Sequence, residues 1–239
     1  MTKLKNLIYC TICARGGSRG VVNKNIKKIK NKPLIFYTIN LAIKSKIFDR
    51  IILSTDNIKI FNLCKKEKKI ECFFLRKPSL SNSKSGKILA IRDAVKRAEK
   101  HFNETCIDVC DLDVTSPLRI KKDIVDAFKK FKHKKYDNLF TVCPSRKNPY
   151  FNMIELNKKN EVKIVKKFKN KLYRRQDAPK IYEMNASIYF WKKEILFRVN
   201  YLFRKNTGTY LMPFHRSIDI DTDEDLKLVN FFIKNNDKI

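Results

Sequence analysis

The stretch that most restricts the fold is an apolar run that ends in a glycine-rich loop. Residues 7–14 have the length and apolar character of a buried strand, and residues 14–25 read Ala-Arg-Gly-Gly-Ser-Arg-Gly-Val-Val-Asn-Lys-Asn. Strand and helix patterns then alternate along the chain, with crossovers of roughly a dozen residues or more. Such alternation predicts an α/β fold, with a mostly parallel central sheet covered by helices on both faces.

The other elements follow from the same patterns. Helices are predicted over residues 34–47, 58–68, 88–102, 122–131, 193–202 and 223–235. Strands are predicted over residues 50–53, 70–75, 106–112 and 138–143, and residues 183–191 should return to the core. We expect Ser54, Thr55 and Asp56 to cap the second helix and Thr222 to cap the last.

Residues 144–182 have a different pattern. Short alternating runs occur at 151–154 and 162–165 without a long helix, which predicts antiparallel hairpins inserted in the sheet fold. The chain shows no internal repeat and no domain linker. We therefore expect a single domain over residues 1–239, with an insertion at about 144–182.

The loop at 14–25 has the composition of a phosphate-binding loop. Its glycines should turn the backbone through positive φ and aim amides inward, while its cations should bind oxyanions. These residues are Gly16, Gly17 and Gly20, with Arg15, Arg19 and Lys24. Their spacing fits neither the Walker loop nor the Gly-x-Gly-x-x-Gly dinucleotide motif. The remaining alternative for this stretch alone is a tight surface turn in a very basic protein.

Asp219 and Asp221 form a second candidate site. Alternate residues of an extended chain share a face, so both carboxylates should point one way while Ile218 and Ile220 point into the core. Oxygen pairs of this kind suit Mg²⁺, which bridges to substrate phosphates. The alternative is a surface turn that precedes the last helix.

Charge and cysteine content limit the other classes of protein. The formal net charge of +30 raises nucleic-acid binding as a hypothesis, but the lysines are spread along the whole chain rather than gathered in one arm or tail. The seven cysteines, with no secretory signal, predict reduced thiols in a cytoplasmic protein. Cys10 and Cys13 lack the second pair that a zinc site would need. The first apolar run is too short to span a membrane.

The chain resembles the acylneuraminate cytidylyltransferases, which activate nine-carbon sugar acids as CMP-glycosides. The matching segments are 14–25, 32–35, 48–50, 54–56, 115–119, 175–176, 185–189 and 218–222. Within that family it looks most like the CMP-legionaminic acid synthetases, and the segments that carry this likeness are 10–14, 148–152 and 184–187. The resemblance implies a nucleotide-diphospho-sugar transferase-like fold. It also implies a homodimer, in which the insertion reaches the second subunit and completes the sugar site.

The reaction implied by the resemblance is attack of the anomeric hydroxyl of a nonulosonic acid on the α-phosphate of CTP, with pyrophosphate leaving. The implied cofactor is Mg²⁺, held by Asp219 and Asp221. The implied catalytic cations are Arg15, Arg19 and Lys24, and the implied nucleotide contacts are Ala14, Gly16, Gly17, Asn25, Arg76 and Lys87. Arg19 stands where the family usually has lysine, and its forked guanidinium makes a different contact. Lys87 ends a polar stretch that reads equally well as a flexible loop.

The sugar contacts implied by the resemblance are Asp113, Thr115, Ser116, Arg175, Gln176, Asn185 and Tyr189. Arg175 could bind the sugar carboxylate through two parallel hydrogen bonds. Asp113 is a departure, because relatives that activate sialic acid tend to have glutamine there. A carboxylate accepts but does not donate, so Asp113 should favour sugars that present N–H or hydroxyl donors, as a legionaminic acid does. Asp113 and Asp111 together are an alternative metal site.

The sequence is also compatible with alternative functions. Within the family, the product could instead be CMP-N-acetylneuraminic acid or CMP-pseudaminic acid. In other classes, the alternatives are a basic nucleic-acid-binding protein and a dinucleotide-dependent dehydrogenase, and the dispersed lysines and the missing glycine motif argue against them. The expected partners are therefore CTP, a nonulosonic acid and a second copy of the chain, without nucleic acid or membrane.

Overall fold

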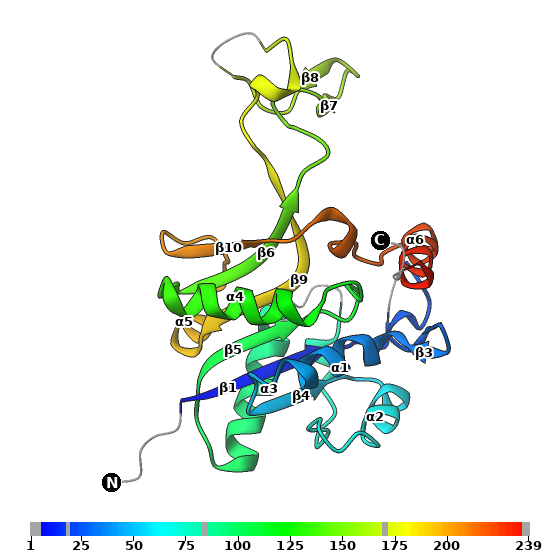
Figure 1. Ribbon diagram of the computed structural model, residues 1–239, viewed down its shortest axis with the longest axis vertical. Helices are drawn as coiled ribbons and strands as arrows, with labels where there is room; N and C mark the ends of the chain where they lie inside the picture. Colours follow the sequence, from blue (N-terminus) through cyan, green and yellow to red (C-terminus); the bar gives the residue numbers. More distant parts are fainter. Residues whose placement is uncertain (1–5, 18–19, 83–85, 169–171, 236–239) are drawn as a thin grey trace.

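A six-stranded sheet flanked by helices forms the body of the protein (Figure 1). The computed structural model describes residues 6–17, 20–82, 86–168 and 172–235. The strands of this sheet are β1 (Leu7–Cys13), β4 (Arg50–Ser54), β5 (Cys106–Leu112), β6 (Asn138–Pro144), β9 (Tyr182–Lys192) and β10 (Thr207–Leu211). The α-helices are α1 (Leu34–Ser45), α2 (Ile58–Cys64), α3 (Lys87–Phe102), α4 (Lys121–His133), α5 (Lys193–Arg198) and α6 (Asp223–Lys234).

Short elements complete the described part of the chain. Two small antiparallel pairs join β2 (Lys28–Ile29) to β3 (Lys32–Pro33), and β7 (Ile154–Leu156) to β8 (Val162–Ile164). The 3-10 helices are η1 (Lys24–Ile26), η2 (Pro78–Leu80), η3 (Arg175–Asp177) and η4 (Phe214–Arg216).

The strand order of the main sheet is β10-β6-β9-β5-β1-β4. β1 pairs in parallel with both β4 and β5, and β10 pairs in parallel with β6. β9 lies between β5 and β6 and is antiparallel to both. The predicted mostly parallel sheet is therefore confirmed, with β9 as its reversed strand.

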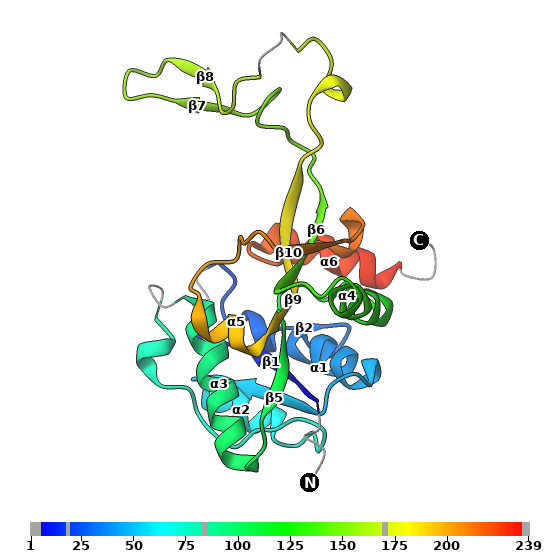
Figure 2. The ribbon, with the colours of Figure 1, turned by 90° about the vertical axis from the view of Figure 1, so that its left-hand side faces the viewer.

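Helices cover both faces of the sheet, as the alternation of elements predicts (Figure 2). Cys10 and Ile12 of β1 point into the larger core, to which α1, α4 and α6 contribute. Tyr9 points to the opposite face, where β1 packs against α3. Successive residues of a strand face opposite sides of the sheet, and β1 is covered on both sides. Residues that face either way must therefore be apolar, which explains the continuous apolar run.

The predicted strand at 70–75 is wrong. Only Glu71 pairs with β4, through a parallel bridge to Ile52. Phe73 and Phe74 are consecutive, yet both pack against the core around α3, with the Phe73 ring stacked 4.3 Å from that of His101. Consecutive side chains on the same side are incompatible with a regular strand, so the segment leaves β4 after one residue.

The cap of α2 and the end of α5 differ from the prediction. Asn57, and not the residues at 54–56, caps α2, because its Oδ1 accepts hydrogen bonds from the amides of Lys59 and Ile60. The helix predicted at 193–202 ends at Arg198, and β10 follows it without having been predicted. The predicted cap at Thr222 is confirmed, since its side chain accepts from the amide of Asp225.

The insertion extends from the ends of β6 and β9, away from the body of the protein (Figures 1 and 2). It contains the antiparallel β7–β8 hairpin expected from the alternating runs. Exposed apolar side chains gather on it, among them Ile154, Leu156 and Val162 of that hairpin. Among the described residues, no helix combines the length and the apolar character needed to cross a bilayer.

A substitution at Gly208 tests how closely β10 packs against Tyr136. A Cβ at this position would overlap the ring of Tyr136, so the ring or the strand must move in Gly208→Ala. Overpacking of this kind costs about 1–3 kcal/mol, and each kcal/mol lowers the Tm of a chain this long by roughly 2–4 °C. Gly17→Ala is the control, because a Cβ there would meet nothing within 4 Å. Equal melting temperatures for the two variants in scanning calorimetry would contradict this packing.

Candidate active site

A cavity of about 350 Å³ lies where β1 and β5 end, and we call it the main cavity. Carboxyl ends of parallel strands are where ligands of open α/β sheets bind. The main cavity contains many of the residues predicted for the nucleotide, the metal and the sugar. Those on its wall are Arg15, Gly20, Lys24, Asn25, Arg76, Lys87, Asp113, Thr115, Asp219 and Asp221.

Lys24 joins the loop after β1 to the segment before α6. Its ammonium donates to the carbonyl of Ile220 and lies 3.0 Å from Asp221 Oδ1. Ile220 is fully buried, and its amide donates to the carbonyl of Thr115 in the loop after β5. Three segments that are distant in sequence therefore meet on one side of the main cavity.

The glycines of the loop act differently from the prediction. No glycine in the described part of the chain has positive φ, so the expected left-handed turns are wrong. Instead, Gly20 lies against the carbonyl of Asp221, where any Cβ would overlap that oxygen. A Cβ on Gly16 would come within 2.7 Å of Asn57 Nδ2. Because glycine has no side chain, the loop backbone can lie close to Asn57 at Gly16 and to the Asp221 carbonyl at Gly20. Gly17 faces open space.

Of the two arginines that the structure describes on the main cavity, Arg15 has the guanidinium more available to a ligand. In the described structure its side chain makes no hydrogen bond or ion pair, although it lines the main cavity. Asn25 Nδ2 donates to the Arg15 carbonyl at 2.8 Å and so holds the backbone of this residue. Arg76 is buried beside Asp56, at 3.7 Å, and its Nε donates to Ser81.

Asp56 is a residue whose role in the loop the sequence analysis missed. It was predicted as a helix cap, but its Oδ1 accepts from the amide of Gly16 at 2.8 Å. The same carboxylate lies near Arg76, so it links the loop to a cation of the main cavity. The position of Asp56 just after a strand could have predicted this role, because ligands bind at the carboxyl ends of strands in such sheets.

Asp219 is the carboxylate whose chemistry is most perturbed. Burial raises its pKa to about 6, with the charges of Asp113 and Asp221 acting in the same direction, while a hydrogen bond from Thr115 opposes the shift. Its Oδ1 is buried and has no hydrogen-bond partner among the residues that the structure describes. A buried oxygen without a partner, near a second carboxylate on the same cavity, fits a hard divalent cation such as Mg²⁺.

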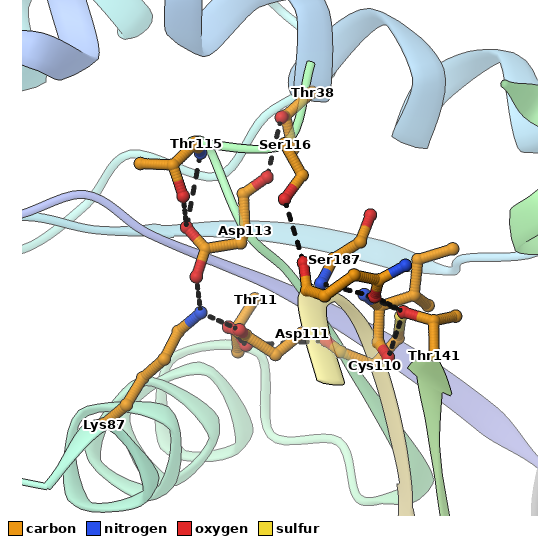
Figure 3. Close-up of polar contacts among 12 residues, drawn as sticks. Thr11, Thr38, Lys87, Cys110, Asp111, Asp113, Thr115, Ser116, Thr141 and Ser187 are labelled. Carbon is orange, nitrogen blue, oxygen red and sulfur yellow. Dashed lines mark hydrogen bonds and ion pairs between the residues drawn. The ribbon is translucent and has the colours of Figure 1, made fainter. Parts of the chain in front are cut away.

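Lys87 lies between two carboxylates at the end of β5 (Figure 3). Its ammonium donates to Asp113 and forms an ion pair with Asp111 Oδ2 at 2.7 Å. Burial alone would lower the pKa of Lys87, but the two carboxylates raise it well above its usual value. Burial alone would raise the pKa of Asp113, but the Lys87 ammonium outweighs this effect and holds the pKa below its usual value. The ammonium occupies the place between Asp111 and Asp113 that their proposed metal would need, which argues against that alternative.

Three of the predicted contact residues that do not line the main cavity are buried in the core. Ala14 is fully buried, and its amide donates to the carbonyl of Ser54. Ser116 is also fully buried, and its hydroxyl donates to the carbonyl of Asn185. The amide of Asn185 bonds to Ser217 and Thr141, so its side chain supports the core rather than facing the cavity. Arg19 lies outside the described residues.

Tyr189 lines a second cavity of about 380 Å³ beside the first, which we call the apolar cavity. Its ring stacks 5.5 Å from that of Trp191, and burial raises the pKa of its hydroxyl to about 12. Lys87 lines both cavities, and Asp111 lies on the wall of the apolar one.

Arg175 and Gln176 lie in the insertion, at η3, and line a separate cavity there. The Arg175 guanidinium donates to the carbonyl of Ser145 at 3.0 Å. Within one chain these two residues are therefore not brought to the main cavity.

Comparison with known proteins gives the family. Residues 9–237 match the family model described as cytidylyltransferase, and the chain belongs to the cytidylyltransferase family. It is 44% identical to CMP-N,N'-diacetyllegionaminic acid synthase of Campylobacter jejuni, over 95% of this chain and 94% of the relative. It is 43% identical to post-translational flagellin modification protein B of Campylobacter coli, over 95% of each chain.

Solved structures support the fold. A CMP:2-keto-3-deoxy-manno-octonic acid synthetase in complex with CTP superimposes with a TM-score of 0.68, covering 96% of this chain and 99% of that one. The sequence identity is only 13%, so this likeness extends to the architecture alone.

Asp219→Asn should stabilise the protein at neutral pH when metal is removed by EDTA. Because the folded-state pKa of about 6 exceeds the ordinary value of 3.8, the folded protein between these values binds a proton that the unfolded chain has lost. The stability contributed by this carboxyl is therefore greatest near about pH 4 and falls as the pH rises through 6. Urea unfolding should show a larger gain for the variant at about pH 7.5 than at about pH 4.5. The same gain at both pH values would contradict the raised pKa.

Proposed function

We propose that this cytidylyltransferase transfers CMP from CTP to the anomeric hydroxyl of a nonulosonic acid and releases pyrophosphate. The observation that carries the proposal is the main cavity, in which the cations of Arg15, Lys24 and Arg76 share one space with the carboxylates of Asp219 and Asp221. Cations suit a triphosphate, and paired carboxylates suit the metal ion that accompanies it. The family membership supports CTP as the nucleotide.

The residues of the main cavity would act by position and charge. Arg15 is the available guanidinium and would bind the phosphates on which charge develops when pyrophosphate leaves. Lys24 would neutralise charge beside Asp221, with its ammonium held by the Ile220 carbonyl. Arg19 would add a further cation from the same loop. Asn25 would act through the backbone of Arg15, whose carbonyl it binds.

Asp219 and Asp221 would hold Mg²⁺. When bound, this ion would order phosphate and sugar oxygens and neutralise part of their charge. The unpartnered Oδ1 of Asp219 supports the assignment, because such an oxygen is costly to bury unless a ligand is present. Asp221 has a largely exposed side chain, and Lys24 is its one cationic partner within the described ranges, so it can reorient toward a ligand.

The insertion supports the proposal that the working form is a homodimer. Its exposed apolar side chains would be covered by a second copy of the chain, because exposed apolar patches on proteins often mark interaction surfaces. In such a dimer, Arg175 and Gln176 of one subunit would approach the main cavity of the other. Tyr189 would contact the sugar within its own subunit, where the apolar cavity adjoins the main one.

N,N'-diacetyllegionaminic acid, or a close relative, is the sugar acid that we propose. The support is the identity of 44% with a synthase of that CMP-sugar, over nearly the full length of both chains. The flagellin modification protein of similar identity supports a role in making sugars for flagellin or surface glycans. N-Acetylneuraminic acid and pseudaminic acid are the alternative substrates.

Pyrophosphate release tests the proposal directly. The assay combines CTP, UTP, ATP or GTP with each of the three sugar acids, in the presence of Mg²⁺. We expect release only with CTP, and the highest kcat/KM with the legionaminic acid. Release with another nucleotide would refute the cytidylyl transfer, and a preference for another sugar acid would refute the substrate assignment alone.

Arg15→Ala should lower turnover by about 10²–10³, the usual scale for loss of one preorganised contact to developing charge. Arg198→Ala is the matched control, because this arginine lies on the exposed side of α5. Steady-state kinetics at saturating CTP and sugar acid would measure both variants. If Arg15→Ala stays within about threefold of the wild type while it remains folded, Arg15 does not contact the phosphates.

A further inference from the structure

We propose that Lys87 contacts the acceptor sugar, and that its free N–H donates a hydrogen bond to an uncharged oxygen of the sugar, a hydroxyl or an amide carbonyl. This inference rests on the proposed function and deepens it. The family resemblance implies instead that Lys87 contacts the nucleotide, so the two assignments make different predictions.

Lys87 forms part of the wall between the two cavities. It lines the main cavity together with Asp113, and it lines the apolar cavity together with Asp111 and Tyr189. Its ammonium lies 5.8 Å from the centre of the Tyr189 ring, and its side chain is 35% exposed. A substrate that reaches from the phosphates into the apolar cavity must therefore pass the Lys87 ammonium.

The ammonium of Lys87 lies where a positive charge would be electrostatically unfavourable without the two carboxylates. It is the first residue of α3, where the positive end of the helix dipole disfavours a cation, and the first turn contains no acidic residue. Asp111 and Asp113 are alternate residues at the end of β5, so they face the same way and hold the ammonium between them (Figure 3). Asp111 is fully buried and is fixed on its other oxygen by Thr11, at 2.7 Å.

The hydrogen bonds of this cluster leave one donor free. A lysine ammonium has three N–H groups. One of them donates to Asp113, and Asp111 Oδ2 lies at ion-pair distance, 2.7 Å, without a hydrogen bond in the described structure, so at most two are directed to the carboxylates. Among the described residues, no third acceptor contacts Lys87. Both carboxylate oxygens of Asp113 already accept hydrogen bonds, since its Oδ2 accepts from Lys87 and its Oδ1 accepts from the amide and hydroxyl of Thr115. The group that this cluster offers to a substrate is therefore a donor from Lys87, rather than the carboxylate of Asp113.

The charge of the cluster selects the kind of acceptor. Two carboxylates against one ammonium give a formal charge of −1, which repels a phosphate or the carboxylate of the sugar. A hydroxyl or an amide carbonyl has no such penalty and accepts strongly from a charged donor. Lys87 therefore contacts the uncharged part of the sugar, while Arg15 and Lys24 bind the phosphates.

Kinetics of Lys87→Met test the assignment. Methionine keeps the length of the side chain and removes the donor and the charge. We expect the KM for the sugar acid to rise by about tenfold or more, the scale for one hydrogen bond to a charged group, while the KM for CTP changes by less than about threefold. Lys87→Arg should restore most of the loss, because it keeps a charged donor. Lys100→Met, on the exposed end of the same helix, should leave both constants unchanged.

Asp113→Asn separates direct contact from positioning. If Lys87 acts only by holding Asp113, the two variants should raise the KM for the sugar equally. If Lys87 touches the sugar, Asp113→Asn should have the smaller effect, because Asp111 still holds the ammonium. An equal rise would overturn the proposal, as would a rise in the KM for CTP alone. If the wild type is inactive with every sugar acid, the proposed function fails first.

Sugar analogues identify the accepting oxygen. In a cycle that combines Lys87→Met with analogues lacking one hydroxyl or one acyl group, the effect of the variant should vanish for the analogue that lacks the acceptor. If the full effect persists with every analogue, the acceptor is the carboxylate that all of them share, and the assignment to an uncharged oxygen is wrong.

Discussion

The contact between Lys24 and the segment around Asp221 is the interaction on which the site depends. It joins residues that are 196 and 197 positions apart, and it places the loop after β1 beside the carboxylates before α6. Gly20 makes the approach possible, because no side chain separates it from the Asp221 carbonyl. The buried Ile220, bonded through its amide to Thr115, fixes the same segment to the loop after β5. The residues that we propose for phosphate and metal binding are thus joined by direct contacts.

Charge is balanced locally in a protein whose formal net charge is +30. Most of the lysines are dispersed over the surface, but the site arranges a few cations and carboxylates in specific pairs. Lys24 neutralises Asp221, and Lys87 neutralises much of the charge on Asp111 and Asp113. Arg15 has no carboxylate partner in the described structure, and Asp219 has no cation within ion-pair distance there. These two groups are therefore the ones best suited to receive the phosphates and the metal ion.

The sequence predicted the parallel framework well, because strands buried on both faces require apolar runs such as 7–14. It also predicted that Asp219 and Asp221 share a face, since the buried Ile218 and Ile220 fix the alternation. It could not predict which side chains turn inward within a segment. Ser116 and Asn185 belong to a matching motif, yet their partners are core groups that only the folded chain brings near. The ion pairs of Lys87 and the irregular backbone at Phe73 likewise depend on contacts distant in sequence.

We propose that the loop after β1 and the carboxylates before α6 bind one CTP together with one metal ion. Calorimetric titration of CTP into the wild type and into Asp221→Asn, each with Mg²⁺ and with EDTA, distinguishes joint from separate binding. Mg²⁺ should tighten the Kd for CTP in the wild type, and this gain should be largely lost in Asp221→Asn, while binding in EDTA is retained. An equal gain from Mg²⁺ in both proteins would show that Asp221 does not hold the metal ion beside CTP.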